Sequence, residues 1–125
     1  MIYDSDLFLT DHELRSLAGT QSSFIELAKA FHQTGCAVTV LTASERIHSQ
    51  TGFFWGPLNT NISADTFDLM LVNVSPVLLH RFRSVATKRR VLWVHNEAKY
   101  LFYWSRYKYL LRYWPIIVFS GKYHR

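Results

Sequence analysis

Short apolar runs alternate with segments of helical periodicity along this chain. One segment has apolar residues at i, i+3, i+4 and i+7, which predicts an amphipathic helix presenting Phe24, Leu27, Ala28 and Phe31. Thr20, Ser22 and Ser23 are candidate N-caps for it, and Ser23 with Glu26 matches a capping box. Gly35 stands where the end of a helix favours a positive φ.

The apolar runs predict about six strands, which begin at Ile2-Tyr3 and continue at 37–42, 53–55, 68–73, 91–94 and 116–119. Helical stretches are expected at 75–82 and at 99–114, with Pro115 ending the second. Strands that alternate with helices across short connections predict parallel pairing through right-handed crossovers. The pattern therefore indicates an α/β fold with a doubly wound, mostly parallel, Rossmann-like sheet.

Composition limits the possible classes. A length of 125 residues indicates a single domain, 1–125, and 49% hydrophobic with 18% charged residues is typical of a folded chain. The single cysteine, Cys36, excludes an internal disulfide framework and suits a reducing compartment. No apolar run reaches the roughly 18 residues that span a bilayer, and no basic segment of a signal peptide opens the chain. A cytoplasmic location is expected.

The charges are distributed unevenly. Residues 1–80 carry three basic side chains against eight acidic ones, whereas residues 81–125 carry eleven basic side chains against Glu97 alone. Such asymmetry predicts that the second half of the chain faces an anionic partner, either lipid head groups or nucleic acid.

The segment 99–114 holds eight aromatic and four cationic residues and no acid. As one helix it would be roughly 24 Å long. Aromatic rings and cations together are typical of a helix at a membrane interface, with candidate lipid-binding residues Trp104, Arg106, Lys108, Arg112 and Trp114. The alternatives are a core helix whose cations stay in solvent, and a surface that stacks single-stranded nucleic acid, which is not the partner we expect.

Ligands of such sheets bind at the carboxyl ends of the strands. The segments that follow strands are 4–20, 42–45, 73–76, 95–97 and 120–124, which makes Asn96 and Ser120 candidate substrate-binding residues. His95 could hydrogen-bond a substrate hydroxyl or titrate near neutral pH, or it could be a loop histidine bonded to backbone.

The start of the first helix offers a second candidate site. Backbone N–H groups at Gly19, Thr20 and Gln21, with the positive end of the helix dipole, could hold a phosphate or a sugar hydroxyl, or the segment could be a plain helix cap. Gly19 is the only glycine before Gly35, so the glycine-rich turn of a dinucleotide-binding domain is missing, although Glu45 could bind a ribose. No histidine spacing indicates a metal site, and no Gly-x-Ser-x-Gly motif supports a hydrolase triad.

Four segments together resemble the N-terminal domain of GT-B glycosyltransferases, and of glycosyltransferase family 4 in particular. Residues 19–35 with the strand 38–42 are similar to the opening of that family, and residues 68–73, 90–96 and 117–124 follow in the expected order. Together they cover nearly the whole chain. The usual Gly-Gly pair of the opening is here Ala18-Gly19.

The resemblance implies a two-domain enzyme whose N-terminal domain binds a glycan or lipid-linked acceptor. The C-terminal domain, with its paired glutamates, would bind a nucleotide-sugar donor, which is a substrate and not a cofactor. Family members typically retain the anomeric configuration without a metal, and many work at membranes. By position Gly19 and Thr20 match the loop near the donor phosphates, and His95 matches the histidine beside the reacting sugar. We expect the donor domain to be absent from this chain, which would then be inactive alone but would pair with that domain.

Overall fold

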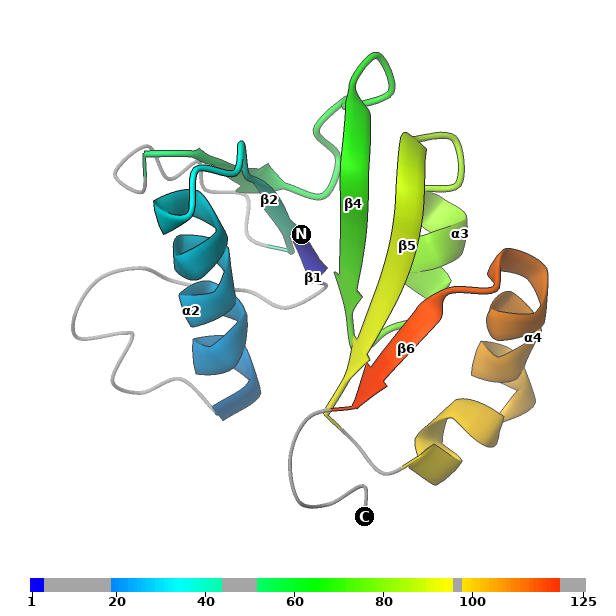
Figure 1. The fold of residues 1–125 in the computed structure, drawn as a ribbon. Helices are drawn as coiled ribbons and strands as arrows, with labels where there is room; N and C mark the ends of the chain where they lie inside the picture. Colours follow the sequence, from blue (N-terminus) through cyan, green and yellow to red (C-terminus); the bar gives the residue numbers. More distant parts are fainter. Residues whose placement is uncertain (4–18, 44–51, 96–97, 120–125) are drawn as a thin grey trace. The chain divides into compact units, whose positions relative to one another are not determined.

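The computed structural model describes residues 1–3, 19–43, 52–95 and 98–119 (Figure 1). The chain divides into two compact units, one of Met1 with residues 3–60 and the other of Ile2 with residues 61–125. The described elements, in chain order, are β1 (Ile2–Tyr3), α2 (Gly19–Gln33), β2 (Thr39–Thr42), β3 (Phe54–Pro57), β4 (Thr66–Asn73), α3 (Val77–Arg81), β5 (Ala86–Val94), the 3₁₀ helix η1 (Ala98–Phe102), α4 (Trp104–Tyr113) and β6 (Ile116–Phe119).

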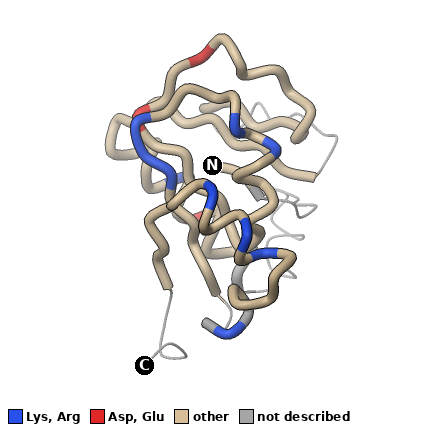
Figure 2. The backbone as a smooth tube through the Cα atoms, turned by 90° about the vertical axis from the view of Figure 1, so that its right-hand side faces the viewer, with Lys and Arg blue, Asp and Glu red and all other residues tan. Residues whose placement is uncertain are grey.

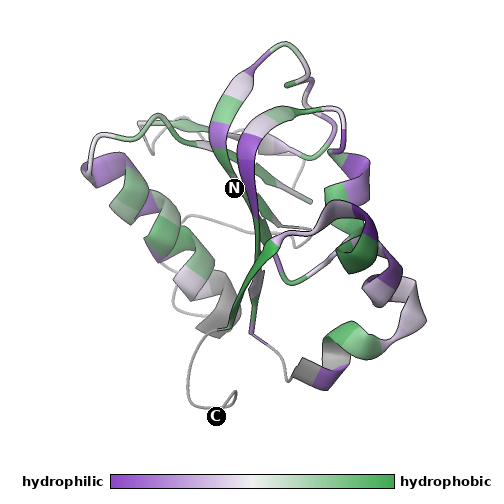
Figure 3. Ribbon diagram, turned by 45° about the vertical axis from the view of Figure 1, so that its right-hand side comes forward, coloured by the Kyte–Doolittle hydropathy of each residue, from purple (hydrophilic) through white to green (hydrophobic). Residues whose placement is uncertain are grey.

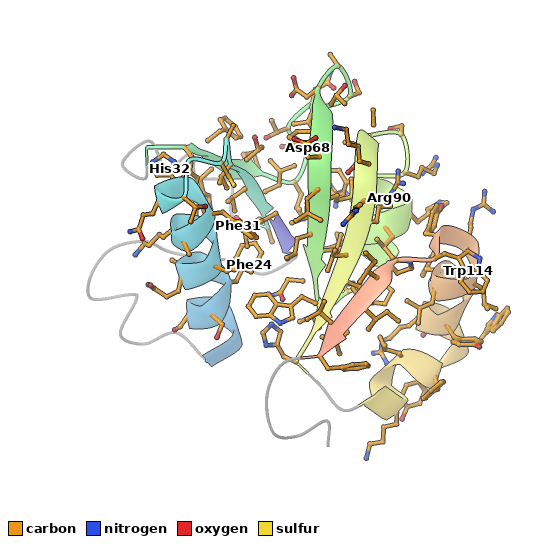
Figure 4. The ribbon with its side chains drawn as sticks, viewed as in Figure 1. Phe24, Phe31, His32, Asp68, Arg90 and Trp114 are labelled. Carbon is orange, nitrogen blue, oxygen red and sulfur yellow. The ribbon has the colours of Figure 1, made fainter. Side chains whose placement is uncertain are left out.

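The first unit contains α2 and the parallel strands β2 and β3. These two strands pair from Thr39, which lies opposite Phe54. The buried cluster of this unit consists of Phe24, Ile25, Ala28, Val40 and Trp55. Phe24 points from α2 toward the strands of the unit (Figure 4) and meets Trp55 edge to face, with 6.4 Å between ring centroids. The predicted apolar face of α2 is thus confirmed at Phe24, and Gly35 has the expected positive φ of 91°.

In the second unit, β4, β5 and β6 lie side by side as parallel strands (Figure 1). Ile2 of β1 adds a parallel partner opposite Val72 of β4. The helix α3 lies between β4 and β5 in the chain, and α4 lies between β5 and β6. Apolar side chains of β4, α3 and β5, with Phe82 directly after α3, are buried in this unit, namely Met70, Leu71, Val72, Leu78, Leu79, Phe82, Leu92 and Val94.

The chain is therefore a mixed α/β protein with parallel strands, as the alternating pattern predicted. The strands predicted at 37–42, 53–55, 68–73 and 116–119 are present with bounds that differ by at most a few residues.

Three local predictions were wrong. Thr20, Ser22 and Ser23 lie inside α2 and do not cap it, because the helix already begins at Gly19. The strand predicted at 91–94 begins earlier, at Ala86, because pairing with β4 begins at Ala86 opposite Thr66. The segment 99–114 is two helices, because Tyr103 has the extended backbone angles φ −65° and ψ 132° between η1 and α4.

Candidate functional site

The carboxyl ends of β4 and β5 form one edge of the sheet in the second unit. Asn73 is the last residue of β4 and pairs with Trp93 of β5, and His95 comes directly after β5 ends. The strands are parallel, so side chains that leave their carboxyl ends reach the same edge, which is where ligands of parallel sheets bind.

A side-chain hydrogen bond joins the two strand ends. The amide oxygen Oδ1 of Asn73 lies 2.9 Å from Nε2 of His95. A carbonyl oxygen only accepts, so this geometry makes Nε2 of the neutral ring the protonated nitrogen. Asn73 is fully buried, whereas His95 is half-buried and packs on Trp93 with 4.3 Å between ring centroids. His95 is thus held from two directions, and its second ring nitrogen, Nδ1, carries the lone pair.

The chain turns tightly where β4 ends. The Ser75 N–H donates to the Asn73 carbonyl at 2.8 Å, across Val74 with a φ of 67°. A bond from residue i+2 to residue i around a central residue of this φ is a γ-turn of the rare, strained kind. A β-branched residue in the left-handed region is unusual, and such strain gathers at functional sites. No sequence signal indicated it.

The structure places Gly19, Thr20 and Gln21 in the first turn of α2, whose backbone N–H groups have no partner within the helix. These residues belong to the first unit, whereas His95 belongs to the second. There are therefore two candidate sites, one in each unit. The candidates Asn96 and Ser120 lie outside the described residues. The structure therefore brings together His95 and Asn73. Asn73 opens the segment 73–76 that the sequence placed at this edge, but it was not named as a binding residue.

The aromatic and basic helix α4 is open to solvent. None of its residues is buried, and Trp104 and Trp114 are 69% and 80% exposed. Trp114 lies just after the last turn of α4 (Figure 4), in a left-handed conformation directly before Pro115. Lys108 and Arg112 are exposed, and Arg106 is half-buried. The interpretation of this segment as a core helix is thus wrong for α4.

A second polar cluster joins α3 to α4. Nδ1 of His80 lies 2.6 Å from the hydroxyl of Tyr113, and its ring also lies near that of Tyr109. Burial, followed by the neighbouring cations Arg83, Arg112 and Lys108, lowers the pKa of His80. The sequence suggested no link between positions 80 and 113, because 33 residues separate them.

Basic positions outnumber acidic ones over the described chain (Figure 2). The described ion pairs, Lys29 with Glu26 and Lys88 with Asp68, lie on α2 and between β4 and β5. No described residue of α4 is acidic, so its cations form a field of one sign. Among the described residues, no three metal-binding side chains form a group and no helix is long and apolar enough to cross a membrane.

A scan with models of protein families and searches of curated proteins and of solved structures found no significant match to this chain.

Proposed function

We propose that this chain is the acceptor-side domain of a GT-B glycosyltransferase, one that transfers a sugar from a nucleotide-sugar donor to a glycan or lipid-linked acceptor. The observation that carries the proposal is the pair formed by His95 and Asn73 at the shared carboxyl edge of β4 and β5. The parallel α/β architecture also fits a doubly wound, Rossmann-like half of that fold, which would work together with a donor-binding domain.

In this proposal His95 touches the reacting groups. Its imidazole hydrogen-bonds a hydroxyl of the bound sugar. The face of Trp93, already in contact with His95, offers an apolar surface beside it. Within the first unit, the backbone N–H groups of Gly19 and Thr20 in the first α2 turn are a separate candidate phosphate site, where the helix dipole favours negative charge.

Binding of simple sugars to the chain tests the proposal without a donor domain. The probes are methyl glycosides of glucose, galactose, mannose and N-acetylglucosamine, followed by NMR of the chain labelled at its histidines. We expect at least one glycoside to shift the ring signals of His95 in a saturable manner, and His95→Gln to weaken its binding about tenfold.

His80→Gln is the matched control, because it removes a histidine of the same unit at a different place, on α3. Binding that weakens equally in both variants would contradict a site at His95. Saturable binding of a nicotinamide dinucleotide with no response to any glycoside would favour a dinucleotide-dependent enzyme instead.

A second candidate function is docking on an anionic membrane through the α4 surface, which we define as Phe102, Trp104, Arg106, Lys108, Arg112 and Trp114. The observation that favours it is the exposure of both tryptophans beside cations with no acid on the helix. Tryptophan rings prefer the membrane–water interface, and each cation near anionic lipid contributes about 1 kcal/mol. The two candidates are compatible, since lipid-linked acceptors lie in membranes; together they suggest a peripheral protein of the inner membrane face.

Sedimentation with vesicles tests the α4 surface. We expect binding to vesicles of phosphatidylglycerol mixed with phosphatidylcholine and little binding to phosphatidylcholine alone. The double variant R106E/K108E should bind at least tenfold more weakly, since each reversal removes an attraction and adds a repulsion of about 1 kcal/mol.

The control is K29E/K88E, which makes the same change of net charge on α2 and β5. If the control loses as much binding as R106E/K108E, overall charge and not the α4 surface is responsible. Equal binding by R106E/K108E and the unaltered chain would remove this candidate function.

A further inference from the structure

We infer that Asn73 is a positioning residue, which holds the imidazole of His95 in one orientation with the proton on Nε2. The inference rests on the proposed function for its consequence, because His95 is the residue that would meet the sugar. The orientation itself is a property of this chain and is measurable without substrate.

The chemistry follows from what each atom can do. An amide oxygen accepts hydrogen bonds and never donates, so the 2.9 Å contact between Oδ1 of Asn73 and Nε2 of His95 requires a proton on Nε2. The neutral ring then has its lone pair on Nδ1. Nδ1 is therefore the acceptor of the ring and Nε2 the donor. Asn73 thereby decides which nitrogen of His95 donates and which accepts.

The buried amide of Asn73 carries an energetic cost. The side chain is fully buried, and its Nδ2 has no hydrogen-bond partner among the described residues. A buried donor without a partner is unfavourable, and leucine, which is similar in shape, would remove that penalty. The hydrogen bond that Oδ1 accepts from Nε2 of His95 is the contact that an apolar residue could not replace.

Backbone hydrogen bonds also fix the position of Asn73. Asn73 is paired with Trp93 in the sheet, and the Val74 N–H donates to the Trp93 carbonyl at 2.8 Å. The strained turn at Val74 ends β4 directly after Asn73. Trp93 also packs against the ring of His95, so one strand end supports both partners of the bond.

NMR of the histidine rings in the chain tests this inference. In the unaltered protein, above the titration of free histidine at about pH 6.5, we expect ring-nitrogen shifts of the Nε2-protonated form and a slowly exchanging proton on Nε2 of His95. Asn73→Leu should abolish the slow exchange. Asn73→Asp should preserve it, because a carboxylate also accepts from Nε2.

Ser75→Ala is the matched control, since it alters a side chain in the same turn and leaves Asn73 in place; it should leave the Nε2 proton slowly exchanging. A proton on Nδ1 in the unaltered protein would overturn the inference. So would a slowly exchanging Nε2 proton in Asn73→Leu. If Asn73→Leu does not fold, the ring-nitrogen shifts of the unaltered protein and of Asn73→Asp decide the matter alone.

Glycoside binding by the same variants separates this inference from the proposed function. If the Nε2 proton exchanges fast in Asn73→Leu and this variant binds glycosides about tenfold more weakly, both are supported. Fast exchange in a chain for which no glycoside has measurable affinity supports the role of Asn73 and contradicts the proposed function. Glycoside binding at His95 that is unchanged in Asn73→Leu, with slow exchange of the Nε2 proton, contradicts the role of Asn73 alone.

Discussion

Two four-residue strands of this protein, β2 and β6, differ in burial in a way that their sequences do not suggest. β2 contains two threonines, yet its residues Val40, Leu41 and Thr42 are all buried. β6 reads Ile-Ile-Val-Phe, and all four of its residues are exposed. Figure 3 shows β6 as a hydrophobic strand at the front of the second unit. Apolar character marks a segment as a strand, but burial depends on what packs over it.

The tryptophans show the same contrast. Trp55 of β3 has no exposed surface and contacts Phe24 of α2, whereas Trp114 after α4 is 80% exposed. The buried ring contributes packing that stabilises the fold, whereas the exposed ring contributes little packing. Substitutions at the two positions should therefore differ in their effect on stability.

The largest effect is expected at the tryptophans. Trp55→Ala should lower the free energy of unfolding by about 3–5 kcal/mol, because it removes a fully buried aromatic side chain and leaves a cavity. Trp114→Ala should change it by less than about 0.5 kcal/mol, as is usual for surface positions. Urea unfolding followed by circular dichroism measures both. A loss of stability in Trp114→Ala close to that of Trp55→Ala would show that something covers the α4 surface in solution.

The strands should give a smaller contrast of the same kind. Leu41→Ala in β2 should cost about 2–5 kcal/mol, since Leu41 is 1% exposed. Ile117→Ala in β6 should cost about 1 kcal/mol, because only part of its surface is removed from water. Urea unfolding of the two variants measures these costs, because a change in the midpoint with an unchanged m-value reports a change in stability. Equal costs would mean that β6 is buried when the protein is in solution.

A pH effect is expected where α3 meets α4. Since the pKa of His80 is lowered in the folded protein, the folded state favours the neutral ring. Stability should therefore fall as the pH drops below the unfolded value of about 6.5 and should level off below the folded pKa. His80→Gln should remove this dependence. Melting temperatures of both proteins across this pH range provide the measurement, and parallel curves would contradict the prediction.

The smallest effect is expected at the exposed pair Asp68 and Lys88, whose charged atoms lie 2.8 Å apart. The hydrogen bond from Lys88 lowers the pKa of Asp68, so the pair is intact at neutral pH and is lost as acid protonates the carboxylate below the unfolded pKa of about 3.8. Solvent screens such pairs, and Asp68→Asn should leave the melting temperature at neutral pH unchanged within error. A clear decrease would show that the pair supports the pairing of β4 and β5.

Elements with strong periodicity could be predicted from the sequence, and contacts over long distances could not. The apolar positions of α2 and the runs that became β2, β4 and β6 follow from local spacing. The interruption at Tyr103 could not be predicted, because the residues on both sides of it favour a helix equally well. The true start of β5 was missed because its first residues are polar and charged, and pairing with β4 includes them in the sheet.

For the candidate site, the sequence indicated the carboxyl end of the strand before His95, and it named His95 but not Asn73 as a site residue. His95 follows an apolar run, so its place at the carboxyl edge was predictable. Asn73 also ends a run, but its bond to His95 depends on the register that sets Asn73 opposite Trp93. The positive φ of Val74 was not predictable, since valine disfavours it. Hydropathy could not reveal a buried amide that is missing one partner.

The central claim is that an acceptor sugar binds at the carboxyl edge of β4 and β5. The most direct test is a map of backbone amide shifts in the full chain as the best-binding methyl glycoside is added. We predict saturable shifts at 73–75 and 93–95, with none at the opposite strand ends, 66–68 and 86–88. Shifts at those opposite ends, or at α4 alone, would contradict the account.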